Sequence, residues 1–220
     1  MAASRDNRLL TDEEINSIGQ RTVDAITEAI DAGDLDRAKD LAQRMHRESL
    51  AMHDGLRDWM TSLFSFIGRR YGDEVLYDAL KDSIGAWIKP LIDVYSKADP
   101  HRRALMHAKI LRGHLVPFRV EEDDEKFTFI LNPCSTGGRM VLEGKYASPH
   151  GFLKVKNAQA MTFGKEDFPV YCCHCPFQEI LPQEIAGYPL FITVPPERPG
   201  EEPCRIHLYK DPKAAPRHQE

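Results

Sequence analysis

The sequence predicts an α+β protein: a helical N-terminal region, then a small antiparallel sheet with long loops that carry a cysteine site. Three observations support this fold class. Apolar residues recur at helical spacing through the first half, short alternating runs follow Pro117, and all five cysteines lie beyond residue 130. We therefore expect a helical region over 1–115 and an antiparallel β region with the cysteine cluster over 116–220, packed together as one integrated domain.

The first half carries start and stop signals for several helices. Thr11 and Glu14 have the spacing of a capping box, in which each side chain satisfies a backbone amide of the other residue. A second helix should begin after Asp34, where a Gly-Asp pair ends the first apolar run. Gly72 should restart the chain as a further helix, and Pro90 should bend or divide that helix because proline removes a backbone donor.

The second half carries strand signals instead. Phe127, Phe129 and Leu131 alternate with other residues, which is the period of a half-buried strand. An acidic turn precedes this run, and a loop rich in proline separates the last two candidates. The predicted strands are residues 118–121, 126–131, 138–142, 189–194 and 205–210.

Composition and charge narrow the class of protein. Hydrophobic residues make up 42% of the chain and charged residues 29%, and the net charge of −5 argues against a nucleic-acid partner. The polar N-terminus lacks the apolar core of a signal peptide, and no apolar run is long enough to span a bilayer. We therefore expect a cytoplasmic protein with a small-molecule substrate and no membrane partner. The sequence leaves the oligomeric state open, a homo-oligomer included.

In a reducing cytosol, clustered cysteines are more often metal ligands or nucleophiles than disulfides. Cys172 and Cys175 form a Cys-x-x-Cys pair, a spacing that lets two thiolates bind one metal centre from a tight turn. A redox pair and two plain buried thiols are the alternatives for this spacing. Downstream, Cys204 and His207 would complete a zinc pattern.

Strand geometry changes the choice of the remaining ligand. If the strand runs over 204–209, His207 points away from the face that Cys204 shares with Ile206 and Leu208. We therefore predict Cys134 as the remaining ligand, which leaves Cys173 spare. The predicted metal ligands are Cys134, Cys172, Cys175 and Cys204, around zinc or, as the alternative, an iron–sulfur cluster.

Cys134 also fits a second chemistry. It precedes a turn of small residues, Ser135 to Gly138, whose backbone amides can converge on an anion. A nucleophilic thiol beside an oxyanion site is therefore an alternative to a metal ligand. Arg139 is the candidate to hold a substrate carboxylate, and His174 is the candidate proton shuttle, with ligation or plain surface exposure as its alternatives.

The remaining histidines and the large aromatics are expected to be structural. His46 and His53, like His107 and His114, are seven residues apart, but the Glu-x-x-His spacing of metal sites in helical bundles is absent. We expect these four histidines on helix surfaces. The aromatic residues expected in the core are Trp59, Phe64, Phe66 and Trp87.

Several short motifs resemble known families. Residues 71–76 (YGDEVL), the Pro133-Cys134 pair and the final segment 204–208 (CRIHL) resemble the L-2-amino-thiazoline-4-carboxylic acid hydrolase family from about residue 55 onward, and more distantly the small-molecule-binding domains of the vinyl-reductase type. Residues 171–174 (YCCH) also resemble a short stretch of organomercurial lyases.

The first resemblance implies a hydrolase that cleaves a C–N or C–S bond of a small heterocycle or amide, with Cys134, the Cys172 group and Cys204 in its site. A non-enzymatic zinc- or iron–sulfur-binding sensor or ligand-binding domain is the alternative. A third reading is an interaction protein whose acidic helices bind a partner.

Overall fold

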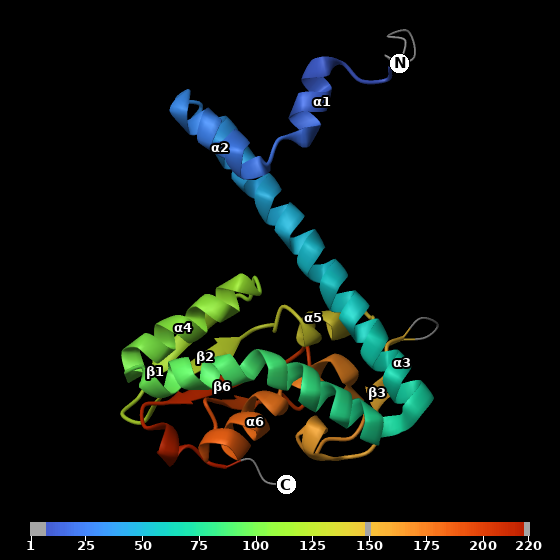
Figure 1. Ribbon diagram of the computed structural model, residues 1–220, viewed down its shortest axis with the longest axis vertical. Coiled ribbons are helices and arrows are strands. Elements are labelled where there is room, and N and C mark those ends of the chain that lie inside the picture. The colour runs from blue at the N-terminus through green and yellow to red at the C-terminus, as the bar shows by residue number, and fades with distance from the viewer. Residues whose placement is uncertain (1–7, 148–150, 218–220) are drawn as a thin grey trace. The chain divides into compact units, whose positions relative to one another are not determined.

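A computed structural model describes residues 8–147 and 151–217, so the polar N-terminus used to argue against a signal peptide lies mostly outside it (Figure 1). The expected α+β class is confirmed, with helices through the N-terminal region and a small antiparallel sheet after them. The chain forms two compact units, residues 1–54 and residues 55–220. The larger unit combines helices from the first half with the sheet, because both contribute to one hydrophobic core.

The smaller unit contains α1 (Asp12–Gly19), α2 (Thr22–Asp31) and the first part of α3 (Leu35–Lys97). The capping box is present: the Glu14 amide donates to Thr11 Oγ1 (3.1 Å), and the Thr11 amide donates to Glu14 Oε2 (2.7 Å). The predicted start after Asp34 is also confirmed, because the Asp34 side chain accepts a hydrogen bond from the Arg37 amide (3.0 Å). The first predicted run is two helices, since the backbone is extended at Gln20.

Within α3 the backbone leaves the helical region at Gly72, where φ is 86°. Glycine adopts this left-handed conformation without the steric cost of a Cβ atom. The predicted restart at Gly72 is therefore confirmed. Of the two effects predicted for Pro90, division of the helix does not occur, because the helix continues through it with helical backbone angles. A bend at Pro90 stays a prediction.

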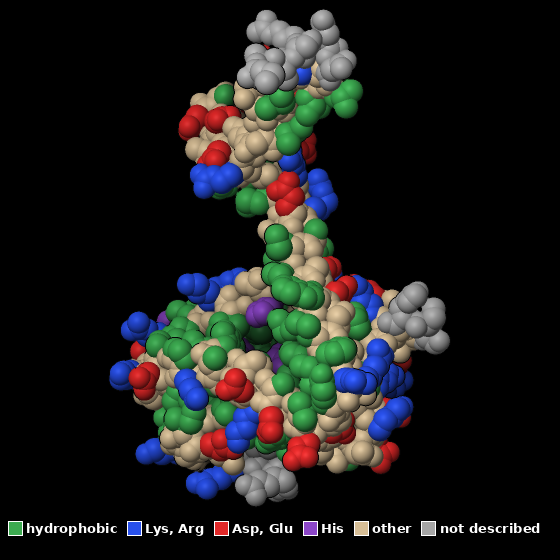
Figure 2. Space-filling view, turned by 45° about the vertical axis from the view of Figure 1, so that its right-hand side comes forward, with side chains coloured by type: hydrophobic (Ala, Val, Ile, Leu, Met, Phe, Trp, Pro, Cys, Tyr) green, Lys and Arg blue, Asp and Glu red, His purple; other side chains and the backbone are tan. Residues whose placement is uncertain are grey.

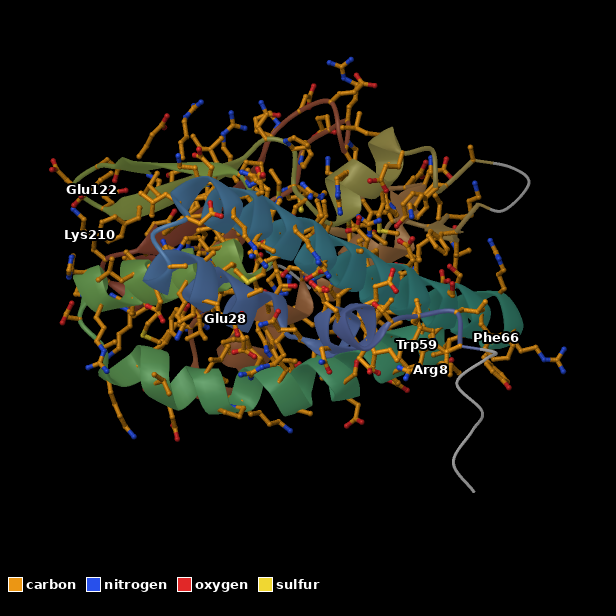
Figure 3. All side chains as sticks on the ribbon, turned by 90° about the horizontal axis from the view of Figure 1, so that it is seen from above. Arg8, Glu28, Trp59, Phe66, Glu122 and Lys210 are labelled. Atoms are coloured by element: carbon orange, nitrogen blue, oxygen red, sulfur yellow. The ribbon has the colours of Figure 1, made fainter. Side chains whose placement is uncertain are left out.

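The main sheet is antiparallel, with the strand order β1-β2-β6-β5 (Figure 1). Its strands are β1 (Phe118–Glu122), β2 (Lys126–Leu131), β5 (Ile192–Val194) and β6 (Cys204–Tyr209). A second, two-stranded sheet pairs β3 (Lys154–Val155) with β4 (Phe168–Pro169). Figure 3 shows Glu122 and Lys210 at one end of the main sheet, where they form an ion pair of 2.7 Å.

Two of the predicted strand positions need correction. Residues 138–142 are not a strand but most of the short helix α5 (Gly137–Leu142), and the strand predicted at 189–194 is limited to Ile192–Val194. The other predicted strands are confirmed within one residue at each end. The remaining elements are α4 (Pro100–Gly113), η2 (Ala160–Thr162), η3 (Val170–His174), α6 (Phe177–Ala186) and η4 (Pro212–Ala214).

The core of the larger unit lies between the sheet and the helices. Leu80 and Ile88 of α3, Phe129 of β2, Phe177 of α6 and Leu208 of β6 are among its buried members. Burying such side chains contributes about 1.5–3 kcal/mol each relative to exposure. None of the helices in the described ranges has a stretch long and apolar enough to cross a lipid bilayer.

The aromatic residues were only partly predicted. Phe64 is buried as expected, but Trp59, Phe66 and Trp87 are 65%, 57% and 44% exposed, so their placement in the core is wrong. Figure 3 shows Trp59 and Phe66 at the outside of the structure. Helical spacing indicates that apolar residues share a face, but it does not say which face meets the core.

The buried face of α4 is formed by Arg103, His107 and Leu111, four residues apart. Arg103 donates to the carbonyl oxygens of Tyr209 (3.1 Å) and Lys210 (2.5 Å). These two bonds attach α4 to the C-terminal end of β6. Burial lowers the pKa of Arg103, but an arginine remains charged at any physiological pH.

Replacing this arginine tests the attachment. Arg103→Ala should lower the free energy of unfolding by about 2–4 kcal/mol, because it removes two charge-assisted hydrogen bonds from a buried location. Arg102→Ala is the matched control, since Arg102 is exposed on the same helix. Urea unfolding followed by circular dichroism measures both, and equal losses in the two variants would contradict the attachment.

Candidate metal centre

The register of the main sheet brings Cys134 and Cys204 to one end of it. In the pairing of β2 with β6, Leu131 lies opposite Cys204. Cys204 is the first residue of β6, and Cys134 follows the last residue of β2 by three positions. Two thiols that are seventy residues apart in the sequence are therefore neighbours because the strands pair antiparallel.

Cys172 and Cys175 come from a tight turn that precedes α6. The amide of Cys175 donates to the Cys172 carbonyl (3.1 Å), which closes the Cys-x-x-Cys turn. Helix α5 packs directly on this turn: a Cβ atom on Gly137 would lie 2.2 Å from Cys172 Sγ. A glycine is thus required for this approach, and it places the turn beside the Cys134 segment.

The predicted cysteines line a common space. Cys134, Cys172, Cys175 and Cys204 all line a cavity of about 50 Å³. Three of them, all except Cys172, also line an adjoining cavity of about 110 Å³. Cys173 differs, since it is buried in the core with its sulfur 3.7 Å from the Pro169 carbonyl oxygen, and all five cysteines are free thiols. The structure therefore brings the predicted ligand set together and leaves Cys173 out.

Burial and mutual proximity keep the thiols of Cys172, Cys175 and Cys204 protonated. Burial raises the pKa of Cys172 and of Cys175 well above the ordinary value, and in both cases the neighbouring thiols raise it further. Burial and the nearby Cys134 and Glu179 raise the pKa of Cys204 in the same direction. Thiolates are therefore unfavourable here unless a positive centre compensates their charge.

His174 lies in the wall of both cavities, as its predicted place at the site requires. Its Nδ1 is 2.5 Å from the Tyr171 carbonyl oxygen, which only accepts hydrogen bonds, so Nδ1 carries the proton. The unprotonated Nε2 is 3.6 Å from Cys175 Sγ. Burial lowers the pKa of His174, so the ring is neutral at physiological pH. Its role in proton transfer stays a prediction.

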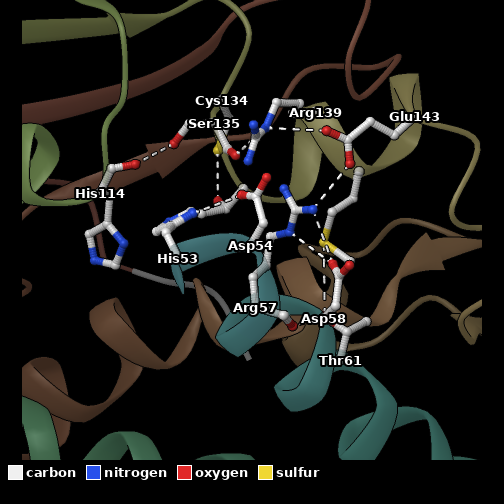
Figure 4. Close-up of polar contacts among 12 residues, drawn as sticks. His53, Asp54, Arg57, Asp58, Thr61, His114, Cys134, Ser135, Arg139 and Glu143 are labelled. Carbon is white, nitrogen blue, oxygen red and sulfur yellow. Dashed lines mark hydrogen bonds and ion pairs between the residues drawn. The ribbon is translucent and has the colours of Figure 1, made fainter. Parts of the chain in front are cut away.

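Arg139 is engaged with the chain itself. Its Nε donates to the Ser135 carbonyl oxygen (3.0 Å), and its guanidinium forms an ion pair with Glu143 (3.5 Å; Figure 4). Arg139 is not among the described residues that line the two cavities. Neither cavity therefore supports the expected contact of Arg139 with a substrate carboxylate, which stays a prediction. Its observed bonds hold the loop that carries Cys134.

Some backbone amides near the small-residue turn after Cys134 already donate hydrogen bonds within the chain. The Arg139 amide donates to the Cys134 carbonyl (2.9 Å) and the Met140 amide to the Thr136 carbonyl (3.0 Å). Cys134 Sγ lies 3.1 Å from Thr136 Oγ1, a hydroxyl that is not a general base. These contacts do not favour a nucleophilic Cys134 beside an oxyanion site.

A network of ion pairs around the buried Arg57 side chain lies next to α5. The Arg57 side chain is almost fully buried and forms ion pairs with Asp58 (3.0 Å) and Glu143 (3.1 Å), and Lys145 also pairs with Asp58 (Figure 4). Glu143 therefore contacts both Arg57 and Arg139. The sequence carries no signal for this network, because Arg57 and Glu143 are 86 residues apart.

His107 and Tyr95 are cavity residues that the sequence did not reveal. His107 is 2% exposed and lies between the rings of Phe129 and Phe191, each with its centroid 4.8 Å away. The prediction that His107 lies on a helix surface is wrong, whereas His114 is exposed as expected. The available signal was the four-residue spacing of His107 from Leu111, which is buried on the same face.

Among the described residues, no group of three or more His, Cys, Asp or Glu side chains is positioned to hold a metal ion. The ligands of a single zinc ion all converge on one point at about 2.0–2.3 Å. The four thiols line one cavity without converging in that way. Zinc and an iron–sulfur cluster at these thiols both stay predictions.

Acidification should destabilise the protein through His107. Burial lowers the pKa of His107 from 6.5 to about 4, so the unfolded chain binds a proton that the folded chain excludes. The free energy of unfolding should therefore fall by about 3 kcal/mol as the pH drops from 6.5 to 4. Denaturant titrations across this range measure the slope. In His107→Leu, the free energy of unfolding should depend less on pH, whereas the exposed His101→Leu control should keep the full dependence. An unchanged pH dependence in His107→Leu, together with its loss in His101→Leu, would contradict the assignment to His107.

Gly137 should tolerate no side chain. Gly137→Ala forces the Cys172 sulfur to move and should cost about 1–3 kcal/mol of stability through overpacking. Gly138→Ala is the matched control, because its Cβ would make an ordinary contact of 3.4 Å with Cys134 Cβ. Thermal unfolding measures the stability of both variants. A Gly137→Ala variant that unfolds at the same temperature as the Gly138→Ala control would refute the close packing of Gly137 on Cys172.

Comparisons of the chain with protein-family models, with curated proteins and with solved structures found no match. The family resemblance of the short motifs is thus neither supported nor opposed by these comparisons. The cysteine-lined cavities and the residues in their walls are the features of the chain that bear on its function.

Proposed function

We propose that this protein is a metalloprotein in which Cys134, Cys172, Cys175 and Cys204 bind an iron–sulfur cluster beside a small-molecule cavity. One observation carries the proposal: four free thiols from three separate segments line the same enclosed space. Sets of four cysteines bind either iron–sulfur clusters or zinc. A positive centre would also offset the charge of thiolates that burial otherwise disfavours.

A cluster, rather than a single ion, is the centre that we propose for these thiols. Around zinc, four sulfurs meet at one atom, whereas in a four-iron cluster each cysteine binds a different iron, so the sulfurs stand farther apart. The four thiols line a cavity of about 50 Å³ that lies between them. Zinc remains the alternative that metal analysis distinguishes.

The cysteine site borders a second cavity. Four cysteine ligands leave a cluster or a zinc ion no open position, so any chemistry would be carried out by residues of the cavity wall and not at an open metal site. Cys134, Cys175 and Cys204 form part of the wall of the larger cavity, so a centre bound there would face a space that accepts a ligand. The neutral His174 lies in the same wall and is the candidate to transfer a proton.

Hydrolysis of a C–N or C–S bond in a small heterocycle or amide is the reaction class that we propose for this space. The family resemblance of the motifs suggests that class. Turnover distinguishes it from a ligand sensor: a hydrolase adds water across the C–N or C–S bond of a small cyclic amide or thioester and gives one ring-opened product with a carboxylate and a free amine or thiol. A sensor binds the same compounds unchanged.

Metal analysis of cysteine variants tests the proposal. The protein is purified anaerobically, reconstituted with iron and sulfide, and examined for iron and sulfide content and for visible absorption. Alanine replacements of Cys134, Cys172, Cys175 and Cys204 should each lower bound iron by about tenfold or more. Cys173→Ala is the matched control, because Cys173 lies in the same turn but faces the core.

The possible outcomes separate the alternatives. Equal iron content in all five variants, or no iron and no zinc in any protein, would overturn the ligand assignment. One zinc per chain, without iron and lost in the same four variants, would overturn the cluster and keep the cysteine ligands.

A further inference from the structure

The larger cavity has an uncharged wall. Its volume is about 110 Å³, and the residues that line it, all within the described part of the chain, include no Asp, Glu, Lys or Arg. Figure 2 shows a hollow edged by hydrophobic side chains, with histidine side chains at its wall. An apolar cavity of about 150 Å³ accepts benzene, and this cavity is somewhat smaller, so a single small ring is the largest molecule expected to fit.

Two polar side chains in this wall lack hydrogen-bond partners. Tyr95 and His107 are each 2% exposed, and neither the tyrosine hydroxyl nor either imidazole nitrogen has a partner. Arg103, which lies near Tyr95, already donates to two carbonyl oxygens of the chain. Leaving such groups unpaired destabilises the folded chain, and most buried polar groups in proteins are paired.

These groups define the kind of molecule that would pair with them. A neutral imidazole has one donor and one acceptor nitrogen, and a phenol hydroxyl both donates and accepts. Burial raises the pKa of Tyr95 to about 12 and lowers that of His107 to about 4, so both groups are neutral at physiological pH. An ionised ligand would lose its hydration without meeting an opposite charge.

The position of His107 allows such contact. Its ring contacts two phenylalanine rings and lines the cavity, and both of its nitrogens are free of partners in the chain. Cys134, Cys175 and Cys204 belong to the same wall. A bound molecule would therefore contact polar groups and the cysteine site within one cavity.

We propose that this cavity binds a small, neutral ring compound that carries a hydroxyl or amide group, hydrogen-bonded by Tyr95 and His107, next to the cysteine site. This adds a ligand class to the proposed function. Because the two polar residues belong to other segments than the cysteines, ligand binding does not require a bound metal.

Calorimetric titration of the full chain with three probes tests the proposal: phenol, benzene and benzoate. Phenol should bind about three- to tenfold more tightly than benzene, as one or two added hydrogen bonds allow, and benzoate should bind more weakly than phenol. Tyr95→Phe and His107→Leu should each reduce the preference for phenol and leave benzene binding within about twofold. Tyr77→Phe is the matched control, since Tyr77 is on α3 but not in this wall.

Stability supplies a second measurement. Tyr95→Phe removes a hydroxyl that has no partner, so the variant should unfold at the same or a higher temperature than the unmodified chain. A loss of stability, or equal affinity for phenol and benzene in the unmodified chain, would overturn the role of these groups. Absence of binding by all three probes to the folded protein would overturn the ligand site.

Measurement with and without iron reconstitution separates this proposal from the preceding one. Phenol binding to protein that takes up no metal would keep the ligand site while the metal centre fails. If iron binds at the cysteines of a protein that binds none of the probes, the metal centre stands and the ligand site is overturned.

Discussion

The antiparallel pairing of β2 with β6 is the constraint on which the cysteine site depends, because it determines where two of the four thiols lie. With Leu131 opposite Cys204, the segment that leaves β2 and the segment that enters β6 meet at one end of the sheet. A slip by one residue would turn Phe129 and Leu131 out of the core, so burial of these side chains fixes the register. The Cys172 turn then joins them through its contact with Gly137.

Around this sheet end the protein buries charge as well as apolar surface. The Arg57 side chain is 1% exposed and its partner Glu143 is 33% exposed, and this ion pair attaches the C-terminal end of α5 to α3. The short helix would otherwise have little to fix it, since it spans only six residues. Rigid support of this kind keeps thiols in place in a site that a metal or a ligand has to find already formed.

The sequence predicted the parts of the site that depend on strand alternation. Cys204 shares a face with buried Ile206, and His207 lies on the other face, where its Nδ1 is 3.4 Å from Thr128 Oγ1. The sequence did not predict that His107 is buried, because α4 buries this histidine while Leu105 of the same helix is exposed. Hydrophobic patterns assign polar residues to the surface, so a buried histidine is invisible to them.

The sequence also could not reveal what long-range packing decides. The segment of α5 is too short for alternation to be told from helical spacing, and Arg139 looked available for a substrate because its partners Ser135 and Glu143 depend on the folded loop. The larger cavity has no charged side chain in its wall. Such a wall offers an ionised molecule no opposite charge, so the salt concentration of the surroundings would have little influence on how far the cavity is filled.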